Sequence, residues 1–153
     1  MSHFKTMKNQ EKSPGQNSIK INKTSLRTTS FSACKTMGVY FDDSNTIGLS
    51  FKFQSCNLSY SSFINLPMKK SVFLDCILHQ VDFSNADLTN SIFEKSDLKN
   101  ALFINSNLEG CNLTLAHTLN IDPTKNRIKG AKFSYENVRG LLTVGLWDLP
   151  AEV

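Results

Sequence analysis

Large apolar side chains recur at every fifth position over most of this chain. Between Phe53 and Phe133 only Thr118 and Pro123 break the period. The apolar positions are Phe53, Leu58, Phe63, Met68, Phe73, Leu78, Phe83, Leu88, Phe93, Leu98, Phe103, Leu108, Leu113, Ile128 and Phe133. An α-helix would repeat every 3.6 residues and a strand every two, so neither explains this spacing. The period of five predicts a solenoid.

Two residues before each of these centres the side chain is small or modestly apolar. The residues are Cys56, Ser61, Ser71, Cys76, Val81, Ala86, Ser91, Ser96, Ala101, Ser106, Cys111 and Ala116. A narrow coil has room for one bulky and one small inward side chain on each short wall. We therefore expect both positions to point inward.

Several units resemble the motif of the pentapeptide-repeat family. Ala86-Asp87-Leu88-Thr89-Asn90 is a close match, and units centred on Leu98 and Leu108 repeat it. The resemblance implies an all-β fold, a right-handed quadrilateral parallel β-helix with four pentads in each coil. Equivalent residues of successive coils should then stack, which places phenylalanines on two opposite walls and mainly aliphatic residues on the other two. We expect ladders of stacked rings inside the coil.

The same period continues towards the N-terminus in a different phase. Its centres are Ile21, Leu26, Phe31, Thr36 and Phe41, each preceded by an inward residue two places earlier, such as Ile19 or Val39. The phase change predicts a two-residue bulge within residues 42–52. Cysteine spacing agrees, because Cys34 and Cys56 are two positions further apart than Cys56 and Cys76.

The chain is therefore divided into three parts. Residues 1–18 read as a disordered basic tail, with a partner-binding arm as the alternative. Residues 19–133 form the β-helix. Residues 134–153 hold a C-terminal helix, capped by Ser134 and ending near Gly145, and a short tail. We expect Val138, Leu141, Leu142 and Trp147 to cover the end of the solenoid.

The resemblance also implies a two-fold contact through this C-terminal segment, and thus a homodimer; a monomer with a capping helix is the alternative. No apolar run approaches the roughly 20 residues that a membrane span needs. The N-terminus lacks the hydrophobic stretch of a secretory signal. We expect a cytoplasmic protein with no membrane contact.

No catalytic, cofactor or metal site emerges from the sequence. The four cysteines occupy inward positions without metal-ligand spacing, so we expect inert thiols. His3, His79 and His117 are not set against a nucleophile, and there is no glycine-rich phosphate loop. We expect no enzyme activity, no cofactor and no small-molecule substrate. The phenylalanines are committed to the core, so direct nucleic-acid binding is not expected either.

Function should therefore lie on the outer surface. The net charge of +4 divides unevenly, with the acidic residues concentrated in the middle of the chain. The candidate partner surface is Val72, Leu74, Ile92, Asp82, Asp87, Glu94 and Asp97. For the apolar members the alternative is ordinary β-propensity. Asn65, Asn85, Asn90, Asn100 and Asn105 stand at turn positions, where we expect a structural role.

Within the family, the stretch from Leu58 to Leu142 is similar to the microcin-immunity and quinolone-resistance branch. The similarity is carried by residues 70–76, 87–93 and 119–128. It implies a non-enzymatic protein that binds DNA gyrase and protects it from a toxin or a quinolone, by partial mimicry of DNA. The alternative is a structural scaffold or interaction module with another protein partner.

Overall fold

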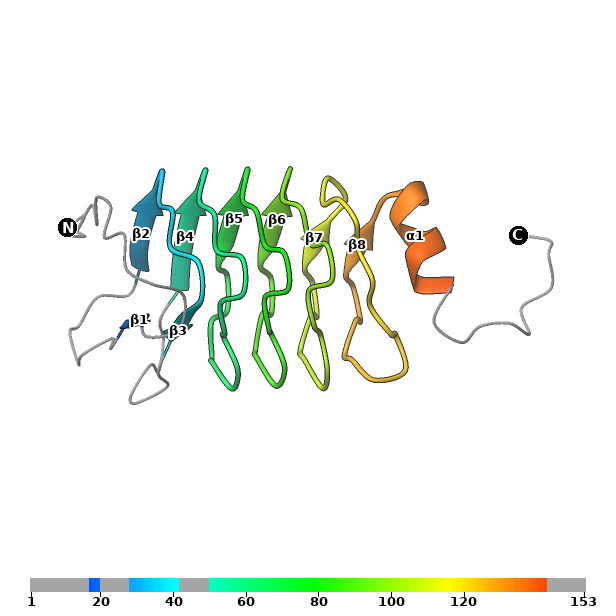
Figure 1. The fold of residues 1–153 in the computed structure, drawn as a ribbon. Helices are drawn as coiled ribbons and strands as arrows, with labels where there is room; N and C mark the ends of the chain where they lie inside the picture. Colours follow the sequence, from blue (N-terminus) through cyan, green and yellow to red (C-terminus); the bar gives the residue numbers. More distant parts are fainter. Residues whose placement is uncertain (1–16, 20–27, 42–49, 143–153) are drawn as a thin grey trace.

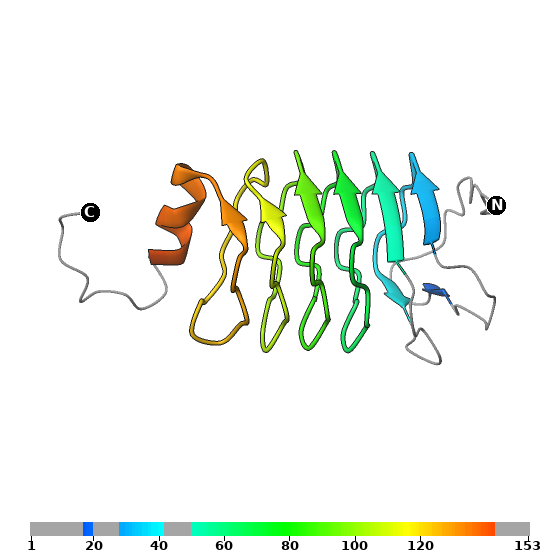
Figure 2. The same ribbon diagram turned by 180° about the vertical axis from the view of Figure 1, so that it is seen from behind.

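The chain winds into a stack of coils that forms a β-helix, closed at one end by a helix (Figure 1). The structure is a computed structural model that describes residues 17–19, 28–41 and 50–142. Seen from behind, the strands follow one another along the rod in chain order (Figure 2). The elements are β1 (Asn17–Ile19), β2 (Thr28–Ser32), β3 (Val39–Phe41), β4 (Ser50–Gln54), β5 (Val72–Leu74), β6 (Ile92–Glu94), β7 (Asn112–Leu113), β8 (Lys132–Phe133) and α1 (Tyr135–Leu142).

Each coil has four walls, which we number in chain order. Wall 1 is the parallel sheet β2-β4-β5-β6-β7-β8. Wall 2 is the column of paired residues from Lys35 through Ile77 and Asp97 to His117, with their neighbours. Wall 3 runs from Tyr40 through Ser62 and Asp82 to Leu102, and wall 4 runs from Pro67 through Asp87 and Asn107 to Arg127. The predicted β-helix is confirmed.

The pairing register changes along the rod. Thr28 pairs with Ser50, whereas Phe53 pairs with Phe73 and Phe73 with Phe93, so the coil that begins at β2 is longer by two residues. The pairs with this longer spacing enclose residues 42–49, which lie outside the described residues, so the predicted bulge within residues 42–52 stays a prediction. The phase predicted further upstream was wrong, because Ile19 is aligned with Phe41 rather than with Val39. The coil that begins at β1 is therefore also two residues longer than the regular coils. The five-residue period of the sequence does not show this, because the period looks the same on both sides of the extra residues.

The interior is a double ladder of phenylalanine rings. On wall 1 the Phe73 and Phe93 rings stack at 4.8 Å, and on wall 3 the Phe63 and Phe83 rings stack at 5.3 Å. Rings of the two opposite walls also meet edge to face, as Phe73 and Phe83 do at 5.7 Å and 83°. Both arrangements are favourable for aromatic quadrupoles. The rod therefore has one continuous aromatic core.

The small inward residues are hydrogen-bonded as well as packed. The buried Ser96 hydroxyl donates to the carbonyl of Phe73 at 3.1 Å and accepts the amide proton of Cys76 at 3.1 Å. Cysteine can take the same place, since the Cys111 thiol donates to the Leu88 carbonyl at 2.9 Å. These side chains link each coil to the one before it. The same hydrogen bonds satisfy the buried hydroxyl groups, which would otherwise be costly to bury.

Nearly every corner places its residue in the left-handed region of backbone space. The five asparagines predicted to occupy turns all do so, with φ between 53° and 62°. Tyr60, Lys70 and Lys95 also have positive φ, at 63°, 57° and 51°, although their side chains give no local stabilisation there. The stacked coils impose the corner on these residues.

The repeat is distorted in its last coil. Thr118 and Pro123, which interrupt the apolar period, do not fill the core: Thr118 is exposed with φ 53°, and Pro123 is half-buried. Leu119 and Ile121 are buried instead. The sequence period therefore fails here because two other apolar residues supply the inward side chains.

The described end of the rod is covered by α1. Ser134 caps this helix, its hydroxyl accepting the Asn137 amide proton at 3.1 Å. The Asn137 side chain is buried and donates to the carbonyls of Leu113 and Ala116, at 2.8 and 3.0 Å. Serine and cysteine side chains of one coil make such bonds to the preceding coil, so Asn137 acts as the next rung of the ladder.

Candidate interaction surface

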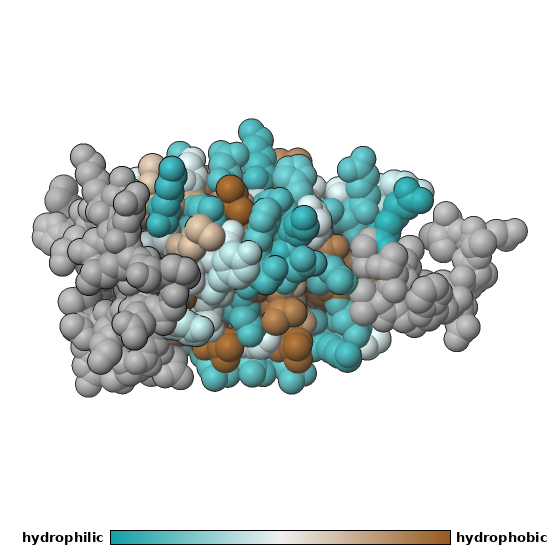
Figure 3. Space-filling model, viewed as in Figure 1, coloured by the Kyte–Doolittle hydropathy of each residue, from teal (hydrophilic) through white to brown (hydrophobic). Residues whose placement is uncertain are grey.

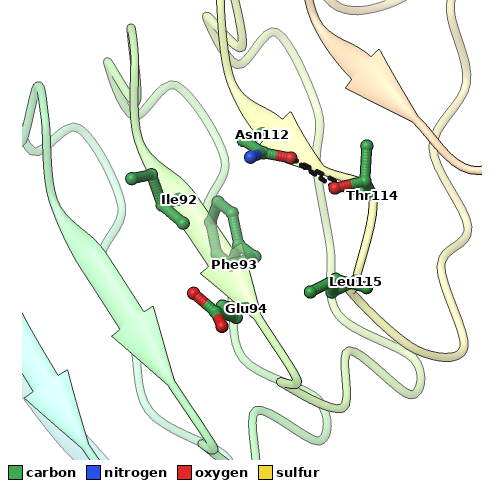
Figure 4. A pocket seen from close by; sticks show the side chains of 6 residues that line it. All are labelled: Ile92, Phe93, Glu94, Asn112, Thr114 and Leu115. Carbon is green, nitrogen blue, oxygen red and sulfur yellow. Dashed lines mark hydrogen bonds between the residues drawn. The ribbon is translucent and has the colours of Figure 1, made fainter.

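The apolar members of the candidate partner surface lie on wall 1. Val72 pairs with Ile92, and Leu74 pairs with Glu94, across β5 and β6. All four side chains are half-buried against their neighbours in the sheet. Beside them is a hollow of about 30 Å³, in which Ile92, Glu94 and Leu115 are among the lining residues (Figure 4). A hollow of this size has room for ordered water but not for a drug-sized ligand.

The three aspartates of the candidate surface are spread over the other walls. Asp97 lies on wall 2, Asp82 on wall 3 and Asp87 on wall 4. Each carboxylate accepts the amide proton of the residue two places on, at 3.1, 2.9 and 3.2 Å respectively. The side-chain oxygen of Asn107 likewise accepts the Glu109 amide proton. The structure therefore does not bring the seven candidate residues together, and it gives the aspartates a local role in holding the wall.

Two of these carboxylates also contact a nitrogen of a basic side chain. Asp87 lies 3.4 Å from the Lys69 ammonium, and Asp97 lies 2.6 Å from Nε2 of His79. Partial burial raises the pKa of Asp87, but the hydrogen bonds from Thr89 and the charge of Lys69 outweigh it and hold the pKa below its usual value. Burial also raises the pKa of Asp97, and hydrogen bonds from His79, Thr118 and the Lys99 amide outweigh it, so that the net pKa is lowered.

The hydrogen bonds and the ion pair of Asp87 should make the protein less stable in acid. Asp87→Asn should make this loss of stability smaller, because asparagine does not titrate. A carboxylate with a depressed folded pKa stabilises the fold above its unfolded pKa, near 4, and loses that contribution as pH falls through the folded value. Because both partners are partly exposed, we expect a contribution of less than about 1 kcal/mol at pH 7. Urea unfolding at several pH values should show wild type and Asp87→Asn converging from pH 5 to 2. A constant difference across that range would contradict the assignment.

The most exposed apolar side chains lie elsewhere, and wall 3 carries the largest group. Tyr40 and Leu102 are 57 % and 47 % exposed on this wall, and Ile64 and Ile104 are exposed beside them at 37 % and 47 %. Tyr60, at the corner between walls 2 and 3, is also exposed. On the face seen in Figure 3, apolar side chains form small patches within a mainly hydrophilic surface. None of these residues belongs to the partner surface predicted from the sequence.

Inside the rod, the buried thiols of Cys34 and Cys111 are unreactive. Burial raises the pKa of Cys111 to about 12 and, with help from Cys56, that of Cys34 to about 11. They therefore remain protonated near neutral pH, where a thiolate would be needed for nucleophilic or metal chemistry. Over the ranges 17–19, 28–41 and 50–142, no group of histidine, cysteine or acidic side chains could hold a metal ion. In the same ranges no helix could cross a bilayer.

At the C-terminal end the four candidate cap and dimer residues have different surroundings. Leu141 is buried, whereas Val138 is 39 % exposed on the outside of α1. Leu142 ends the helix, and the surroundings of its side chain lie outside the described part of the structure, as does Trp147. Tyr135 is exposed at the start of α1. The two-fold contact remains a prediction.

Comparison with known proteins agrees with this architecture. Residues 49–113 match the family described as pentapeptide repeat region. This chain therefore contains a pentapeptide repeat region. The structure resembles that of a trypsin-treated variant of QnrB1, a plasmid-mediated fluoroquinolone resistance protein, with a TM-score of 0.65 and 17 % identity. The match covers 75 % of this chain and 55 % of QnrB1, so the chain spans about half of that protein.

Other solved pentapeptide-repeat proteins are also similar. One from the thylakoid lumen of Arabidopsis thaliana has 22 % identity and a TM-score of 0.46, over 65 % of this chain and 61 % of the other. No curated protein matched. At 17 % identity the likeness to QnrB1 establishes the fold alone, and the function has to be argued from the surface.

Proposed function

We propose that this pentapeptide-repeat protein is a non-catalytic protein-binding rod whose partner is DNA gyrase, and that binding shields gyrase from a quinolone or a toxin. The observation that supports this most is the division of side chains. The inward residues of the regular coils are buried in ring stacks and hydrogen-bonded ladders, so recognition by these coils falls to their outward side chains. The likeness to the fluoroquinolone resistance protein QnrB1 favours gyrase as the partner.

The charges allow only partial DNA mimicry. Of the acidic residues between positions 71 and 123, Asp87, Asp97, Glu109 and Asp122 are paired with lysine, arginine or histidine. Asp75, Asp82 and Glu94 have no such ion pair among the described residues, and they lie in two consecutive coils. A DNA mimic needs a continuous negative potential. We therefore propose that uncharged contacts contribute to binding alongside these three carboxylates.

A second candidate is a scaffold that binds a different protein. The exposed apolar side chains of wall 3 favour the scaffold, because apolar contacts can bind a partner that has no DNA-binding surface.

Under the gyrase proposal the protein is a homodimer in the cytoplasm, where gyrase acts on the chromosome. Sedimentation of the purified protein would report the dimer directly.

Gyrase assays separate the two candidates. Purified protein should change DNA supercoiling by gyrase, or reduce the DNA cleavage that a quinolone stabilises, in a dose-dependent manner. Relaxation by a type I topoisomerase serves as the control reaction and should not change. No effect on either gyrase reaction, together with unchanged quinolone sensitivity of cells that express the protein, would reject gyrase and favour the scaffold.

A further inference from the structure

Among the described residues, wall 3 has its own arrangement of outward side chains. Towards the N-terminal end lie Tyr40, Tyr60 and Ile64, and towards the C-terminal end lie Leu102 and Ile104. We call these the two apolar ends of wall 3. Asp82 lies between them, because it pairs with Ser62 on one side and with Leu102 on the other. The wall therefore presents an apolar, acidic, apolar sequence along the rod.

The acidic centre has spare capacity for a cation. One Asp82 oxygen accepts the Ser84 amide proton at 2.9 Å, and no lysine, arginine or histidine pairs with this carboxylate within the described residues. By contrast, Asp87 on wall 4 is paired with Lys69 and Asp97 on wall 2 with His79. In the described part of wall 3, the outward residues from Tyr40 to Thr124 include no basic side chain. Lys125, at the corner that follows, is paired with Asp122 at 3.6 Å, so no unpaired basic side chain of the described part of this wall opposes a positively charged partner group at Asp82.

The spacing of the apolar ends fits one kind of partner. Ile64 and Ile104 are separated by two coils, and coils stack about 4.8 Å apart, so these side chains lie about 10 Å apart along the rod. Residues seven apart on an α-helix are separated by about 10.5 Å and share one face. An amphipathic helix laid along wall 3 would place apolar residues at these ends and a residue three or four places from each over Asp82.

We propose that wall 3 is a docking surface for a basic amphipathic helix of a protein partner, with two apolar side chains seven residues apart and a lysine or arginine between them. This inference rests on the proposed role as a protein binder and adds the wall and the chemistry of the partner. The apolar contacts supply affinity, and the Asp82 carboxylate selects a cationic side chain and sets the orientation.

A displayed library of helical peptides provides the probe. Against the folded full chain, enriched peptides should carry the apolar, basic, apolar pattern with seven-residue spacing. Ile104→Ser should weaken their binding about tenfold or more, and Asp82→Asn about threefold or more, because asparagine can still accept the Ser84 amide proton but carries no charge. Binding to wild type and not to Asp82→Asn should weaken with added salt. Ile77→Ser is the matched control, since Ile77 is similarly exposed, at 41 %, on wall 2.

The outcomes separate this inference from the gyrase proposal. A library that yields no enrichment, or peptides that bind Ile104→Ser as tightly as wild type, would overturn docking on wall 3. Gyrase assays with Ile104→Ser complete the test. An effect on gyrase that survives this substitution, with no peptide enrichment, leaves the gyrase proposal standing without wall 3. Peptide binding that depends on wall 3, with no effect on gyrase, leaves wall 3 standing with another partner.

Discussion

Phe83→Ala is expected to lower the free energy of unfolding by about 3–5 kcal/mol, the usual cost of removing a buried aromatic ring. Phe83 is fully buried and stacks on Phe63 and Phe103 at 5.3 and 5.1 Å. It also meets Phe73 and Phe93 edge to face. The rings above and below belong to separate coils, so the cavity cannot close without shifting the hydrogen-bonded ladder. Urea unfolding followed by circular dichroism measures the change.

The control for Phe83→Ala lies on the same wall. Leu102 is 47 % exposed and points outward, so Leu102→Ala should cost less than about 1 kcal/mol. Equal losses from Phe83→Ala and Leu102→Ala would contradict the assignment of inward and outward positions, because both changes remove a large apolar side chain from wall 3.

Asn137→Leu is expected to cost about 2–3 kcal/mol, although leucine has nearly the same size and is the better helix former. The substitution leaves the Ala116 carbonyl without its donor, and the Leu113 carbonyl keeps only the Ala116 amide proton of the two that it accepts. An unsatisfied buried group costs about 1–3 kcal/mol. Thermal unfolding and proteolysis of α1 should both report the loss.

A neighbouring position provides the comparison for Asn137→Leu. Val138→Leu alters an exposed residue in the same turn of α1 and removes no hydrogen-bonding side chain, so stability should change by less than about 0.5 kcal/mol. If Asn137→Leu were as stable as Val138→Leu, the Asn137 amide could not be the group that closes the end of the ladder.

Much of the fold follows from the sequence, because a single rule relates neighbouring coils. Once Phe53, Phe73 and Phe93 are recognised as equivalent positions of successive coils, the stacks and the walls are fixed. The rule fails where coils differ in length. The period gives Ile19 the wrong register because the first described coil, like the next, is two residues longer than the regular ones. Near the other end Leu119 and Ile121 fill the core after the chain distorts, in place of the residues that the period selects.

The candidate surface was harder to predict. The sequence identifies outward residues, but it does not show which acidic side chains on a wall lack an ion pair. That depends on contacts between coils, such as the one between Lys69 and Asp87. It also indicates only a packing role for Ser96 and the cysteines, because the bond from Ser96 to the Phe73 carbonyl becomes visible only when the coils are stacked. Asn137 was missed for the same reason.

Photo-cross-linking to purified gyrase tests most directly the claim that this protein binds gyrase through wall 3. A photoreactive phenylalanine analogue at position 102, on wall 3, should form an adduct with a gyrase subunit, and the same group at position 77, on wall 2, should not. Adducts of equal yield at both positions, or none from position 102 while gyrase activity still responds to the protein, would contradict the account.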